Sequence, residues 1–95
     1  IVDNTVGVLG TTPKNFTLFV APNPNGGSFN LRINTPSTEP VSIRIIDNLG
    51  NVVYHREKLI GSTIQQNITG NFKPGVYLLI ATQNGKQYIR KVLVL

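Results

Sequence analysis

From residue 16 onward, short runs of β-branched and aromatic residues are separated at nearly regular intervals by glycine, proline and asparagine. No stretch shows the 3.6-residue spacing of apolar residues that identifies an amphipathic helix. Short strands separated by turn residues in this way are typical of a β-sandwich or a β-barrel. The pattern therefore predicts an all-β chain, and its 95 residues suffice for a single domain but not for two.

Seven strands are expected. The clearest contains Phe29, Leu31 and Ile33, which alternate with polar residues and so predict one buried and one hydrated face. Residues 75–81 are apolar on both alternating sets, which predicts a strand in the middle of a sheet. The expected strands cover residues 16–20, 29–33, 41–45, 52–56, 64–68, 75–81 and 87–95.

Three turns are predicted from residues that accept positive φ or bond their own backbone. The segment 47–51 includes Gly50 and should close a hairpin in which the Asp47 carboxylate accepts bonds from its own backbone. Asn84-Gly85 is a strong signal for a second hairpin. The motif Pro22-Asn23-Pro24 must also lie in a turn, because two prolines fix φ and remove two backbone donors.

The first fifteen residues differ from the rest of the chain. Residues 1–15 have few apolar side chains and no usable periodicity, so they predict a flexible linker that precedes a folded domain over 16–95. The chain contains no methionine, even at position 1, which suggests a piece excised from a longer protein. We expect proteolysis to cut the linker before the folded domain.

The polar composition offers little for catalysis. There is no cysteine, and the chain has four acidic residues and one histidine, which is too few for a metal site or a nucleophilic centre. If the 47–51 hairpin is tight, His55 lies near Arg44 on the partner strand, where a neighbouring cation disfavours a general base. The sequence therefore predicts a non-enzymatic domain with no cofactor, no metal and no catalytic residue.

The formal charge is +5, and its excess lies entirely in the C-terminal part of the chain. This imbalance favours an anionic partner, but scattered cations without interleaved aromatic residues do not indicate nucleic-acid binding. No apolar run approaches the roughly 20 residues of a membrane-spanning helix. Three tyrosines could form a sugar-binding platform, but each lies within a strand pattern, which favours packing: Tyr54, Tyr77 and Tyr88.

Several motifs, taken in their order and spacing, resemble the type A C-terminal sorting domain of the type IX secretion system of Bacteroidota. The resemblance covers residues 16–95 and rests on these segments: Leu18-Phe19-Val20-Ala21-Pro22-Asn23-Pro24, Phe29-Asn30-Leu31-Arg32-Ile33, Ile45-Ile46-Asp47-Asn48-Leu49-Gly50-Asn51-Val52-Val53, Phe72-Lys73-Pro74-Gly75-Val76-Tyr77, Gly85 and Lys91-Val92-Leu93-Val94. Two positions depart from the family pattern. Ala21 stands where tyrosine is common, and no charged residue follows Leu95.

The resemblance implies an immunoglobulin-like, seven-stranded antiparallel β-sandwich at the C-terminus of a secreted cargo protein. It implies that an outer-membrane translocon recognises this domain and carries the cargo from the periplasm to the cell surface or the medium. A sortase-like surface peptidase then usually removes the domain and often attaches the cargo to anionic lipopolysaccharide. The sequence does not define an oligomeric state.

We expect the recognition signal to include residues from these motifs. Most of the turn residues should act through the fold, whereas Lys91 is a cation among apolar residues and fits either direct recognition or a hydrated strand face. The candidates are Pro22, Asn23, Pro24, Asp47, Gly50, Gly75, Tyr77, Gly85, Arg90 and Lys91. The alternative is an immunoglobulin-like or fibronectin-like accessory module that spaces domains or binds carbohydrate.

Overall fold

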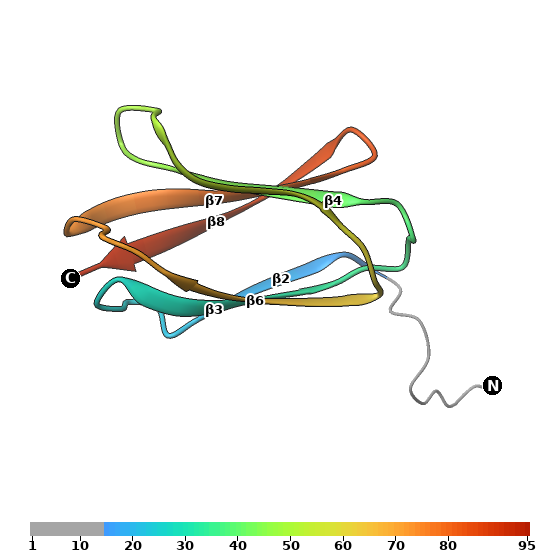
Figure 1. Cartoon of the computed structure of the whole chain (residues 1–95), viewed down its shortest axis with the longest axis horizontal. Coiled ribbons are helices and arrows are strands. Elements are labelled where there is room, and N and C mark those ends of the chain that lie inside the picture. Colours follow the sequence, from blue (N-terminus) through green and yellow to red (C-terminus); the bar gives the residue numbers. More distant parts are fainter. Residues whose placement is uncertain (1–14) are drawn as a thin grey trace.

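The computed structural model describes residues 15–95, which form two stacked β-sheets (Figure 1). One sheet has three strands in the order β2-β3-β6, and the other has four in the order β5-β4-β7-β8. Every strand pair is antiparallel. The strands are β2 (Thr17–Ala21), β3 (Ser28–Asn34), β4 (Val41–Ile46), β5 (Val52–Leu59), β6 (Thr63–Thr69), β7 (Gly75–Gln83) and β8 (Lys86–Val94).

These strands confirm the predicted immunoglobulin-like sandwich. All seven expected strands are present, and β7 lies between β4 and β8, as its apolar character on both sets predicts. The predicted linker, residues 1–15, lies outside the described residues except for Asn15. Within the described part of the chain, no helix is long and apolar enough to cross a membrane.

The core lies between the sheets and receives alternate side chains from both. On β3, Phe29, Leu31 and Ile33 are buried while the residues between them are exposed or half-buried. Leu31 of the three-stranded sheet and Leu79 of the four-stranded sheet are both fully buried in the same cluster. A single core therefore fixes which face of each strand points outward, because a slip of one residue would reverse every side chain.

Both predicted hairpin turns are confirmed. Asn84 and Gly85 have φ of +52° and +81°, the positive values that a two-residue type I′ turn requires. Gln83 and Lys86 pair directly across this turn. In the other hairpin, Gly50 has φ +87°, and Arg44 pairs with His55 as expected.

A small polar network joins the connection after β3 to the end of β7. The buried Thr35 hydroxyl donates to Gln83 Oε1 at 2.7 Å, and Gln83 Nε2 donates to the Glu39 carbonyl at 2.8 Å. Because these buried polar groups bond to one another, the chain can cross from one sheet to the other without leaving them unsatisfied.

Candidate functional site

The 22–27 loop packs along the outer edge of β8. Asn23 Nδ2 donates to the Lys91 carbonyl at 2.8 Å, and Asn23 Oδ1 accepts from the Leu93 N–H at 3.0 Å. The Asn23 side-chain amide therefore bonds β8 as a neighbouring strand would. This contact uses a side chain because the prolines on either side of Asn23 have no N–H to donate.

The backbone of the same loop continues the contact. Asn25 N–H donates to the Leu93 carbonyl at 2.9 Å, and Leu95 N–H donates to the Asn25 carbonyl at 2.8 Å. The buried Asn25 side chain holds the loop in shape, since its Oδ1 accepts from Gly27 N–H and its Nδ2 donates to the Pro22 carbonyl. The C-terminal end of β8 is therefore a covered edge rather than an open one.

Arg90 and Lys91 are adjacent in sequence but lie on opposite faces of β8, because side chains alternate along a strand. Arg90 points toward the other sheet, where its Nε donates to the Leu18 carbonyl of β2 at 2.9 Å. Lys91 is exposed and lies on the outer face, directly opposite Leu78 of β7. The two cations of this basic pair therefore have different structural roles.

Lys91 lies among outward-facing aliphatic side chains. On its own strand, Ile89 and Leu93 point to the same outer face and are 54% and 36% exposed. Across the sheet, outward-facing aliphatic residues continue through β7 and β4 to β5. We call this surface the aliphatic face. It comprises Ile46, Val52, Val76, Leu78, Ile80, Ile89 and Leu93, of which Ile80 is buried and Ile46 and Leu78 are half-buried. Lys91 lies among these residues, and Arg44 borders them beside Ile80.

Three other candidate residues lie at the same end of the sandwich as the 22–27 loop. The 47–51 turn, which contains Asp47 and Gly50, follows Ile46, and Ile46 pairs with Leu78 near the start of β7. Gly75 begins β7 and pairs with Val94. Figure 1 shows the β4–β5 turn, the start of β7 and the C-terminus at one end, and the β7–β8 turn that contains Gly85 at the other.

The Asp47 carboxylate organises its turn. Its Oδ1 accepts from the N–H groups of Asn51 at 2.8 Å and Leu49 at 2.9 Å. These bonds stabilise the ionised carboxylate and so lower the pKa of Asp47 from its usual value, and the bond from the Asn51 N–H contributes most. The predicted turn role of Asp47 is therefore confirmed.

Tyr77 lies in the core rather than on the surface. Its ring is 7% exposed and packs edge-on against Phe72 at a centroid distance of 5.5 Å. Its hydroxyl donates to the Lys73 carbonyl at 2.6 Å, which satisfies the buried polar group and fixes the loop before β7. Tyr88 also packs, since it stacks on Phe16 with centroids 3.8 Å apart.

The histidine is a surface residue of β5, as predicted. His55 Nε2 lies 3.2 Å from the Glu57 carboxylate, and both side chains are more than half exposed. In residues 15–95, no three histidine, cysteine, aspartate or glutamate residues gather in a metal-binding arrangement. His55 and Glu57 thus form an exposed ion pair on the surface of β5.

Two contacts were missed by sequence reasoning. Asn23 bonds residues 68 and 70 positions away, and Arg90 bonds a carbonyl 72 positions away. Only the first has a signal in the sequence. An asparagine between two prolines occupies a segment with few backbone donors, so its amide is the group available to bond a neighbouring strand.

Comparison with known proteins identifies similar sequences. The family described as "Secretion system C-terminal sorting domain" matches residues 19–95. The chain is also 40% identical over 76 residues to an endo-acting ulvan lyase of Formosa agariphila. That match covers 79% of this chain and 14% of the lyase, so the chain corresponds to a small part of that protein's length.

Proposed function

Because the chain belongs to the secretion system C-terminal sorting domains, we propose that the secretion machinery recognises the aliphatic face around Lys91, next to the 22–27 loop. The chain is a type IX secretion signal, and such a signal directs export to the cell surface or the extracellular space. A sorting-signal domain interacts with the secretion system and is not itself catalytic. The family inferred from the sequence motifs is therefore confirmed.

The observation that supports the aliphatic face as the recognition surface is the pair of hydrogen bonds from Asn23 to β8. They bond the backbone on both sides of Val92 and so hold Lys91 and Leu93 at fixed positions beside the loop. An exposed apolar surface that includes a cation is typical of a protein-binding site. A sorting signal must present the same surface whatever cargo precedes it, and a surface held by long-range bonds within the domain meets that requirement.

The other candidates support the surface through the fold. Asp47 and Gly50 form the turn that ends the β4 part of the aliphatic face, and Tyr77 fixes the loop before β7. Gly75 starts the strand that carries Val76, and Gly85 closes the hairpin that brings β8 beside β7. We propose that the outer-membrane translocon binds the aliphatic face. We also propose that residues 1–15 are the linker to an N-terminal cargo and contain the site at which a sortase-like peptidase cuts.

Export of a reporter tests this proposal. The 95-residue chain is fused to the C-terminus of a periplasmically exported fluorescent protein in a type IX-competent host. The unmodified fusion should reach the cell surface or medium, and Lys91→Gln should lower that fraction several-fold. The matched control Lys86→Gln removes an exposed cation at the far end of β8 and should be exported normally.

Arg90→Gln separates recognition from stability. Because Arg90 bonds the Leu18 carbonyl, its loss should cost about 1 kcal/mol of unfolding free energy, whereas Lys91→Gln should cost less than about 0.5 kcal/mol. At temperatures where it is folded, Arg90→Gln should still be exported. Normal export of Lys91→Gln would show that recognition lies elsewhere on the domain.

The accessory module remains the competing function. An unmodified fusion that stays in the periplasm of a competent host, while other type IX cargo passes, would favour a module that spaces domains or binds carbohydrate. Loss of export in a host without the translocon, with export in the parent host, would favour the translocon as the partner.

A further inference from the structure

The outer face of the three-stranded sheet has a different chemistry from the aliphatic face. Its outward positions are occupied almost entirely by amides, hydroxyls and one guanidinium, together with one exposed aromatic ring. In register across the three strands, these positions are Thr17, Asn34 and Thr63; Phe19, Arg32 and Gln65; and Ala21, Asn30 and Asn67.

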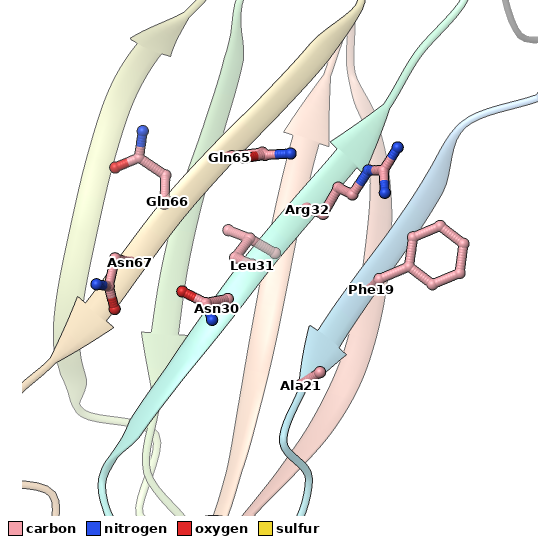
Figure 2. Close-up of a pocket in the computed structure, with 8 residues that line it drawn as sticks. All are labelled: Phe19, Ala21, Asn30, Leu31, Arg32, Gln65, Gln66 and Asn67. Carbon is pink, nitrogen blue, oxygen red and sulfur yellow. The ribbon is translucent and has the colours of Figure 1, made fainter.

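A shallow groove of about 720 Å³ crosses this face. Figure 2 shows Phe19, Arg32 and Gln65 at one level of the sheet, with Asn30 and Asn67 at the next. Ala21 stands beside Asn30 on the edge strand, so the second level has a small side chain where the first has a ring. We call this the amide groove.

Within residues 15–95, the polar groups of the amide groove have no hydrogen-bond partner. The side-chain hydrogen bonds found within residues 15–95 use other positions. The side chains of Asn30, Arg32, Gln65 and Asn67 are therefore not bonded to the described part of the chain. No acidic residue lies on β2, β3 or β6. The Arg32 guanidinium therefore gives the groove a net positive charge without an acid on the same sheet.

We propose that the amide groove binds an extended polysaccharide that carries carboxylate or sulfate groups. Each amide presents a donor and an acceptor side by side, which suits neighbouring sugar hydroxyls. The Phe19 ring, 52% exposed, offers a flat apolar surface on which the C–H face of a sugar ring can stack. Arg32 can form two parallel hydrogen bonds with a carboxylate or a sulfate on the same sugar chain.

The composition of the groove favours a sugar over the other polymers that a basic domain could bind. Single-stranded nucleic acid is held by several stacking aromatic residues and a row of cations. This groove has one aromatic residue, Phe19, and one cation, Arg32. A protein partner favours an apolar centre, which the aliphatic face has and the amide groove lacks. The site lies on the sheet opposite the proposed recognition surface, so this inference does not depend on the function of Lys91.

Binding is tested with the 95-residue chain and size-defined alginate and heparin oligosaccharides, followed by amide chemical shifts in NMR titrations. Shift changes should concentrate at Phe19, Asn30, Arg32, Gln65 and Asn67. Phe19→Ala and Arg32→Gln should each weaken binding at least fivefold. The controls Ile89→Ala and Lys86→Gln, which remove similar groups from the other sheet, should bind as the unmodified chain does.

Three further probes distinguish a sugar site from general attraction to a basic protein. Neutral dextran oligosaccharides should bind at least fivefold more weakly than alginate. Polyglutamate and a single-stranded oligonucleotide should cause no concentrated shifts in the groove. The inference is overturned if either of these binds the groove as tightly as the sugars, if Lys86→Gln weakens binding as much as Arg32→Gln, or if no shifts appear there.

Discussion

The two outer faces of the sandwich are built on one core yet differ in almost every chemical respect. The four-stranded sheet presents valine, leucine and isoleucine around Lys91, whereas the three-stranded sheet presents amides and hydroxyls around Arg32. Burial does not explain this difference, because both faces point away from the shared core. The inward residues form the shared core that determines the fold, whereas the outward residues differ between the two sheets.

The largest effect should come from the core that both faces share. Leu31→Ala and Leu79→Ala each remove a fully buried leucine, one from each sheet, and each should cost about 2–5 kcal/mol of unfolding free energy. Urea denaturation followed by fluorescence of a fused or bound reporter dye, or by circular dichroism, measures this loss. If only one substitution is costly, the sheets do not share a single cooperative core and the comparison of their faces loses its basis.

A smaller effect is expected at the junction that belongs to the aliphatic face alone. Asn23→Ala removes two hydrogen bonds to β8 and should lower the unfolding free energy by about 1–2 kcal/mol. Export should fall with it, while saccharide binding on the other sheet should persist in the folded protein. Asn71→Ala changes an exposed loop asparagine and is the control. Equal thermal stability of the two variants would contradict the structural role of Asn23.

The smallest effect is a pH dependence at the turn beside the aliphatic face. Because the pKa of Asp47 is lowered in the folded state, the ionised carboxylate stabilises the fold above the unfolded value of about 3.9, and this contribution is lost as the pH falls through the folded value. The melting temperature of Asp47→Asn should therefore lie below that of the unmodified chain at pH 7, and the gap should close below about pH 4. A gap that is constant from pH 7 to pH 3 would exclude this contribution.

Local features of the fold could be predicted from the sequence. The Asn84-Gly85 turn, the Asp47 turn and the opposition of Arg44 and His55 all depend on neighbours a few residues apart, where φ preferences and strand alternation decide the structure. The aliphatic face also has a sequence signal, because β7 is apolar on both alternating sets.

Long-range features could not be predicted. Nothing local to Arg90 shows that it bonds β2 while Lys91 faces outward, since the direction of each side chain follows from which face of β8 meets the core. The amide groove was missed for the same reason. Phe19, Arg32 and Gln65 become neighbours only when β2, β3 and β6 pair in register.

The most direct test of the account makes the same kind of substitution once on each outer face. Leu93→Ser and Phe19→Ser each replace an exposed apolar side chain with a small polar one, on the aliphatic face and in the amide groove. The same reporter fusion and cell fractionation are used for both, after thermal unfolding shows that both fold. The account predicts that the Leu93→Ser fusion is retained in the periplasm while the Phe19→Ser fusion reaches the surface like the unmodified chain. Export of Leu93→Ser together with retention of Phe19→Ser would contradict it.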